Sequence, residues 1–209
     1  MKKIGILGGT FNPIHYGHLI FAENACDQYT LDEFWFLPNA QPPHKQGQTI
    51  LPAEHRVNMI RAAIDGNPKF TLSDWELKQE GLSYTARTMT CLTEEYPDTE
   101  FYFLVGEDSL FEIETWVKPE VILSHCRLLV AKRDSRKYGN IITQARYIEE
   151  KYHTKVDFVA FPEVNISSSQ IRERQAAGMT IRYLLPEAVR EYIEQYHLYE
   201  ETGLPDGSF

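Results

Sequence analysis

Two histidines stand where an apolar run meets a helical pattern, in the stretch ILGGTFNPIHYGHLIFAENA, residues 6–25. At the first turn of a helix, the spacing of His15 and His18 puts both imidazoles on one face. Imidazole suits phosphate because it donates hydrogen bonds and can carry charge near neutral pH. Gly8 and Gly9 let the backbone approach a ligand closely and reach conformations closed to larger residues. Since the next helix adds free N–H groups and partial positive charge, this turn predicts an anion site.

Each feature of this turn also has a plainer interpretation. Two glycines after a strand are common in structural turns, and the pattern is neither GxGxxG nor GxxxxGK[ST]. Two histidines could belong to a zinc site, although the spacing indicates no third ligand. For the turn taken by itself, phosphate binding, a structural turn and a metal site all stay open.

A second candidate phosphate site is the stretch ISSSQIRE, residues 166–173. Serine before a helix is a good N-cap, and Arg172 lies about one turn into the expected helix. A helix N-terminus with several hydroxyls and an arginine can hold a polyphosphate. Taken alone, the stretch also fits an N-cap followed by a surface arginine, which is the commoner case.

The elements that must position these residues follow from alternating apolar runs and helical patterns. Strands are expected at 3–7, 33–37, 70–73, 100–105, 127–131 and 156–161. Helices are expected at 14–28, 52–64, 83 or 85 to 95, 141–152, 167–177 and 186–196, with two short pieces in 107–125. The alternation predicts an α/β, Rossmann-like doubly wound fold, a mostly parallel sheet with helices on both faces. Because ligands bind at the carboxyl ends of such strands, the first turn lies where a site is expected.

Domain organisation is simple. We expect one domain over residues 1–200 and a flexible polar tail over 201–209. Residues 38–50 contain three prolines and one glycine and form a loop that is long for a compact domain. Since such loops are usually functional or mobile, we expect this one to close over substrate.

Composition limits the classes of partner. The 209 residues include 21 basic and 30 acidic side chains, a formal net charge of -9, which argues against general affinity for nucleic acid or an anionic membrane. No apolar run approaches the roughly 20 residues of a membrane span, and the first run is too short for a signal peptide. The 3 cysteines form no CxxC pair, so neither a disulfide framework nor a cysteine zinc site is expected. We expect a cytoplasmic protein.

Together, the two phosphate stretches resemble a known superfamily. The string GGTFNPIHYGH, residues 8–18, resembles the T/S-F-x-P-x-H-x-G-H signature of the nucleotidyltransferases. ISSSQIRE is similar to their second signature, I-S-S-T-x-I-R, with Ser169 in place of threonine. The resemblance implies that both histidines bind the triphosphate and stabilise charge at the α-phosphorus, while Arg172 holds the β- and γ-phosphates. The ATP-binding residues it implies are Gly8, Gly9, Thr10, Phe11, His15, His18, Gly106, Asp108, Arg133, Ser168, Ser169 and Arg172.

The middle of the chain resembles bacterial nicotinate mononucleotide adenylyltransferases. LPNAQPPHK at 37–45 is similar to their LPN-x-x-PPHK loop, SYTARTM at 83–89 to S-Y-T-x-x-T-L, and GEDSL at 106–110 to G-x-D-S-L. By this resemblance Lys45 meets the mononucleotide phosphate or the transferred phosphoryl group, and Asp108 accepts hydrogen bonds from ribose hydroxyls.

The same resemblance implies contacts to both bases. Tyr84 and Thr85 bind the nicotinate side, Trp116 stacks on the pyridine ring and Arg133 lies near the adenine. Val117 stands where the family often has histidine or lysine, a departure that concerns only the neighbouring contact. The implied substrate-binding residues are Asn39, His44, Lys45, Tyr84, Thr85 and Trp116. The implied catalytic residues are His15, His18, Lys45 and Arg172.

The implied reaction joins ATP and nicotinate mononucleotide, in NAD biosynthesis, to give deamido-NAD and pyrophosphate by direct in-line attack. Mg²⁺ would arrive with ATP and need no protein metal site. One alternative is another adenylyl- or cytidylyltransferase of the superfamily, and a second is a non-catalytic nucleotide sensor on the same scaffold. A homodimer and the degree of preference for the acid over the amide mononucleotide stay open.

Overall fold

The fold is a parallel sheet wrapped by helices, as the alternation predicts. The computed structural model describes residues 1–40, 50–79, 81, 83–132, 138–160, 162 and 164–200. The expected tail 201–209 lies outside these residues, as does most of the expected loop 38–50.

Six strands and eight α-helices are assigned in the described residues. The strands are β1 Lys2–Gly9, β2 Glu33–Pro38, β3 Phe70–Leu72, β4 Thr99–Val105, β5 Arg127–Lys132 and β6 Val156–Ala160. The α-helices are α1 Tyr16–Tyr29, α2 Ala53–Ile64, α3 Thr85–Glu95, α4 Glu107–Glu112, α5 Pro119–His125, α6 Tyr138–Tyr152, α7 Ser168–Ala176 and α8 Glu187–Gln195. Two 3₁₀ helices are η2 Glu76–Lys78 and η3 Ile113–Thr115. The sequence did not predict η2, and α1 begins two residues later than expected.

The sheet has the strand order β3-β2-β1-β4-β5-β6, and each neighbouring pair is parallel. The chain builds outward from β1 to β3 and then returns to the other side of β1 with β4. This reversal makes the carboxyl ends of β1 and β4 the topological switch point, where ligands bind in open α/β sheets.

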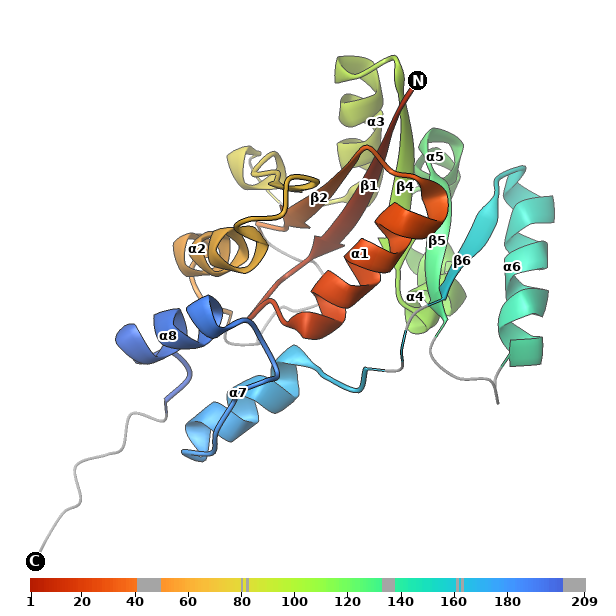
Figure 1. The fold of residues 1–209 in the computed structure, drawn as a ribbon. Coiled ribbons are helices and arrows are strands. Elements are labelled where there is room, and N and C mark those ends of the chain that lie inside the picture. The colour runs from red at the N-terminus through yellow and green to blue at the C-terminus, as the bar shows by residue number, and fades with distance from the viewer. Residues whose placement is uncertain are drawn as a thin grey trace, which may run out of the picture.

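Helices cover both faces of the sheet (Figure 1). One core packs α1, α2, α7 and α8 on the sheet, and the other packs α3, α4, α5 and α6. Successive strand residues alternate between them, so that Phe34 and Phe36 enter the first core while Trp35 and Leu37 enter the second. The predicted doubly wound α/β fold is confirmed.

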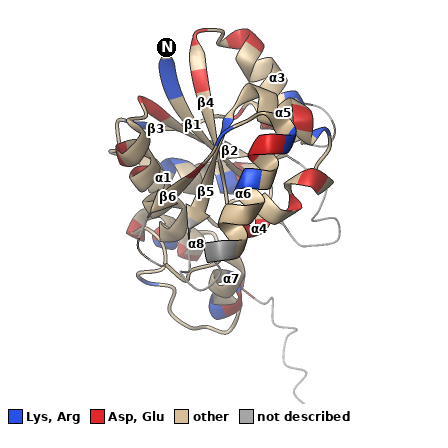
Figure 2. Ribbon diagram, turned by 90° about the vertical axis from the view of Figure 1, so that its right-hand side faces the viewer, with Lys and Arg blue, Asp and Glu red and all other residues tan. Residues whose placement is uncertain are grey.

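Charged side chains lie mainly outside these two cores. In Figure 2, residues of both signs are spread over the outer helices, and the strands at the centre of the sheet are uncharged for most of their length. None of the described helices is long and apolar enough to cross a membrane.

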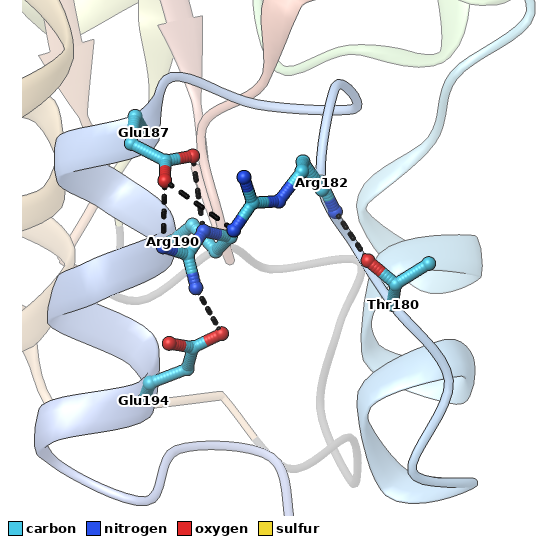
Figure 3. A network of polar contacts seen from close by, with 5 residues as sticks. All are labelled: Thr180, Arg182, Glu187, Arg190 and Glu194. Atoms are coloured by element: carbon cyan, nitrogen blue, oxygen red, sulfur yellow. Dashed lines mark hydrogen bonds and ion pairs between the residues drawn. The ribbon is translucent and has the colours of Figure 1, made fainter.

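Ion pairs tie helix α8 to the segment that precedes it (Figure 3). Arg190 pairs with Glu187 and Glu194, both on its own helix α8. Arg182, in the segment before α8, pairs with Glu187 at 3.7 Å, and its backbone N–H donates to Thr180 Oγ1 at 3.2 Å. Exposed pairs stabilise little individually, but these share partners and hold the segment onto α8. That segment also meets the start of α1, because the Tyr16 N–H donates to the Leu184 carbonyl at 3.2 Å.

We expect Gly5→Ala to destabilise the sheet. A Cβ at Gly5 would lie 2.6 Å from Phe34 Cδ2 and 2.8 Å from Leu31 Cδ1, and both neighbours are fully buried. Forcing an atom into a packed core lowers the free energy of unfolding by about 1–3 kcal/mol. Gly8→Ala, in the same strand, is the control because its Cβ would lie an ordinary 3.5 Å from Phe103. Urea unfolding compares the two, and equal stabilities would contradict the packing explanation.

Candidate active site

The turn between β1 and α1, residues 10–15, lies at the switch point. Its left-handed residue is Phe11, with φ 49°, whereas among the described glycines only Gly66, Gly81 and Gly178 have positive φ. The expectation that Gly8 and Gly9 adopt conformations closed to larger residues is therefore wrong, since both continue the extended strand. The Phe11 side chain is buried and its ring lies edge-on to that of His18, with centroids 5.2 Å apart. Burial of this ring holds the unusual backbone in place.

The two histidines meet as their spacing predicts. Their rings are stacked, with centroids 3.7 Å apart and planes inclined by 26°. The His15 N–H donates to His18 Nδ1 at 3.2 Å, so the proton of a neutral His18 ring lies on Nε2. A Cβ at Gly17 would come within 3.0 Å of the His15 ring, so glycine leaves room for the stack.

Residues at the start of α7, more than 150 positions later in the chain, bind the same turn. The Ser168 hydroxyl donates to the Pro13 carbonyl at 2.8 Å. Arg172 donates through Nη1 to the Asn12 carbonyl at 2.8 Å and through Nη2 to Ser169 Oγ at 3.2 Å. The two stretches singled out for phosphate chemistry therefore form one continuous site.

A cavity of about 400 Å³ opens at this junction. The predicted ATP-binding residues that border it are Gly8, Gly9, Thr10, Phe11, His15, His18, Gly106, Ser168, Ser169 and Arg172. Asp108 is exposed in the first turn of α4 and is not among the described residues that border it. Arg133 lies outside the described residues.

A larger cavity of about 610 Å³ adjoins the first, and both are bordered by Gly8, Gly9 and Thr10. The predicted substrate-binding residues that line it are Asn39, Tyr84, Thr85 and Trp116. His44 and Lys45 lie outside the described residues.

Two side chains give this larger cavity an aromatic surface and a hydrogen-bond acceptor. The half-buried Trp116 ring stands edge-on to Phe103 in β4, with centroids 6.3 Å apart. Asn39 Oδ1 is buried and has no hydrogen-bond partner among the described residues. A buried polar atom of this kind needs a partner, which a ligand can supply.

No group of three or more His, Cys, Asp or Glu side chains suited to a metal ion occurs in the part of the chain that the structure describes. The donors around the smaller cavity are hydroxyls, imidazoles and a guanidinium, which suit an anion.

Known proteins resemble this chain in sequence over most of its length. The cytidylyltransferase-like family model matches residues 6–174. A protein of Lachnoclostridium phytofermentans named "Probable nicotinate-nucleotide adenylyltransferase" is 45% identical over 95% of this chain and 100% of its own length. One of the same name from Geobacillus thermodenitrificans is 43% identical over 95% of this chain and 87% of its own. The chain belongs to the nicotinate-nucleotide adenylyltransferase family. The resemblance drawn from its motifs is thereby confirmed.

Solved structures share the fold of this adenylyltransferase. Plasmodium falciparum nicotinic acid mononucleotide adenylyltransferase complexed with APC superposes with a TM-score of 0.76 at 22% identity, over 95% of this chain and 98% of that one. The same enzyme complexed with NaAD gives 0.79 at 23% identity over the same shares.

A buried carboxyl group of the adenylyltransferase was not singled out from sequence. Glu76, in η2, borders the larger cavity and is only 7% exposed. It accepts hydrogen bonds from Thr88 Oγ1, at 2.7 Å, and from Ser83, whose Oγ accepts from the Ala40 N–H at 3.0 Å. Glu76 therefore links the end of β2 to the start of α3. Its partners are brought together by the tertiary fold, and no local spacing marks them.

We expect the stability of the adenylyltransferase to carry a pH dependence from Glu76. Burial raises the pKa of this carboxyl above its ordinary value of 4.5, and the hydrogen bonds from Thr88 and Ser83 act in the opposite direction. As pH rises above about 4.5 the unfolded state ionises first, so this group's stabilisation is lost as pH rises through the folded pKa. Glu76→Gln removes the titration, and its melting temperature should rise relative to wild type between pH 4.5 and neutral.

Thermal unfolding across this pH range checks the expectation. Glu120→Gln, at an exposed position on α5, is the control and should follow wild type throughout. A constant difference between Glu76→Gln and wild type would contradict the expectation.

Proposed function

We propose that this adenylyltransferase joins ATP and nicotinate mononucleotide to give deamido-NAD and pyrophosphate, as a step of NAD biosynthesis. The observation that carries the proposal is the meeting of the two cavities at Thr10, beside the stacked histidines. Two phosphorylated substrates in adjoining cavities can bring a nucleophilic oxygen to the α-phosphorus. The two Plasmodium complexes, one with APC and one with NaAD, support this class of ligand.

The smaller cavity is proposed to hold the triphosphate. His18 presents Nε2–H as a donor, and Arg172 adds a fixed positive charge. The N-termini of α1 and α7 both border this cavity and favour anions. Asp108 and Arg133 are assigned to the adenosine part on the strength of the motif alone.

The larger cavity is proposed to hold the mononucleotide. The face of Trp116 suits a flat pyridine ring. The first turn of α3 borders this cavity at Thr85, and its N-cap residue Tyr84 makes no side-chain capping bond. A helix N-terminus favours a carboxylate over a neutral amide, which supports nicotinate as the substrate. Asn39 Oδ1 would accept a hydrogen bond from a ribose hydroxyl.

The chemistry needs little from the protein beyond positioning and charge. The mononucleotide phosphate is already an anion, so it attacks the α-phosphorus in line without a general base, and pyrophosphate leaves. His15, His18 and Arg172 stabilise charge on the phosphates, and Lys45 is assigned the same task by its motif.

Magnesium is proposed to arrive bound to ATP, as part of the substrate. Phosphate oxygens and water are its usual ligands in such sites. The hydroxyl and guanidinium donors of the smaller cavity fit the phosphates of such a complex and leave the metal to phosphate and water.

Pyrophosphate release with ATP and Mg²⁺ tests the function. Nicotinate mononucleotide, nicotinamide mononucleotide and phosphopantetheine are offered in parallel, with CTP replacing ATP in a further series. We expect the highest kcat/KM with ATP and nicotinate mononucleotide. A higher value with another pair would replace the substrate assignment, and ATP binding without turnover on any acceptor would favour the sensor.

We expect His18→Ala to lower kcat by about 100-fold or more, because one donor to the developing charge is lost. ATP affinity should change far less, since Arg172 and the helix N-termini remain. His153→Asn is the control. His153 is exposed and lies just before β6, so it is near the amino ends of the strands, whereas the site lies at their carboxyl ends. Steady-state kinetics with equilibrium ATP binding separates the two effects. A near-normal kcat would remove the role assigned to His18.

A further inference from the structure

Arg56, on α2, is a buried cation directly behind the active-site turn. It is 2% exposed, and its guanidinium donates through Nη1 to the Thr10 carbonyl at 2.8 Å and through Nε to the Leu51 carbonyl at 3.1 Å. Within the described residues it forms no ion pair with a carboxylate. Burial lowers the pKa of Arg56 from its ordinary value, yet a guanidinium stays charged. Because burying a charge without a counterion is costly, this arrangement requires a reason.

The same turn is held from the C-terminal segment. The Tyr199 hydroxyl, which follows α8, donates to Asn12 Oδ1 at 2.9 Å, and the Leu51 N–H donates to the same oxygen at 3.4 Å. Burial raises the pKa of Tyr199, while the charges of Arg172 and Arg56 act in the opposite direction, so the phenol is a neutral donor at pH 7.

Helix α8, which precedes Tyr199, is itself fixed on α2. The Tyr192 hydroxyl lies 3.0 Å from His55 Nδ1 and accepts from Asn58 Nδ2 at 3.1 Å, and the two helices lie side by side in Figure 1. Arg56 and Tyr199 therefore bind the turn from α2 and from the residues just after α8, and these two helices are fixed to each other.

The direction of these hydrogen bonds decides what the turn offers to a ligand. In a planar trans peptide the C=O and the following N–H point opposite ways. A Thr10 carbonyl held by Arg56 therefore directs the Phe11 N–H away from Arg56. Thr10 and Phe11 are among the described residues that border the smaller cavity, and Arg56 is not. The Phe11 N–H is thus aimed at the cavity side.

We propose that Arg56 is a positioning residue for adenylyl transfer. It ties the Thr10 carbonyl to residue 51, and so keeps the Phe11 N–H and the histidine pair aligned before ATP binds. Tyr199 completes this support through Asn12. The inference rests on the proposed function for its catalytic consequence only.

Arginine suits this position better than lysine. Its planar fork holds Nε and Nη1 at a fixed separation and can bind two carbonyls at once, whereas lysine has a single head group. Arg56→Lys keeps the charge and loses the fork, and Arg56→Met loses both. Arg61→Met, at an exposed position on the same helix, is the control.

We expect Arg56→Met to lower kcat by about 100-fold, the loss that a misplacement of about 1 Å can cause, and Arg56→Lys to fall between it and wild type. Amide exchange over residues 10–15 should accelerate in both variants, while exchange over 127–132, in β5, stays unchanged. Tyr199→Phe should accelerate exchange over residues 10–15 to a smaller extent. Arg61→Met should match wild type in both measurements.

Each outcome decides between positioning and general support of the fold. Wild-type kcat and exchange in Arg56→Lys would overturn the proposal. Exchange that accelerates equally over 10–15 and 127–132 would also overturn it, because Arg56 would then stabilise the whole domain. If Arg56→Met does not fold, Arg56→Lys and Tyr199→Phe carry the test. If wild type makes no pyrophosphate from ATP and nicotinate mononucleotide, the proposed function fails, and the exchange comparison still decides whether Arg56 holds the turn.

Discussion

The backbone carbonyls of the β1–α1 turn are bound by side chains from α2 and α7, and the rest of the site depends on this. Arg56, Arg172 and Ser168 each donate to one of the carbonyls of residues 10–13. A turn of this kind would otherwise expose carbonyls and amides in arbitrary directions. With these acceptors satisfied, the turn can present its donors to an anion, which is the electrostatic requirement of a phosphate site.

The doubly wound topology explains how such distant donors reach one turn. The switch point leaves the ends of β1 and β4 accessible, and α2, α7 and α8 pack on the same face of the sheet as α1. Helices that follow other strands can therefore contribute side chains to the turn after β1. The second face contributes the larger cavity through the start of α3 and through Trp116, so each substrate is proposed to be held mainly by elements of one face.

Much of this architecture could be predicted from the residues. The strands and α-helices follow from apolar runs and 3.6-residue periodicity, and the stacked pair follows from the spacing of His15 and His18. Sequence did not identify Glu76, Arg56 or Tyr199. Each has a hydrogen-bond partner far along the chain, at 12, 46 and 187 residues, and this partner is chosen by packing. In the β1–α1 turn, the left-handed backbone conformation was expected at a glycine, the residue type that adopts it most easily. It occurs at Phe11 instead, whose ring is held by tertiary contacts that no local pattern records.

The bond between Tyr199 and Asn12 has a consequence for the order in which the molecule matures. It joins residues 187 positions apart, so Asn12 leaves the ribosome well before Tyr199, which completes the support of the turn. All six strands precede α7 in the chain, and a nascent polypeptide can therefore assemble its sheet while the turn still lacks Arg172 and Tyr199. Full support of the turn is thus reached only in chains whose synthesis has passed Tyr199.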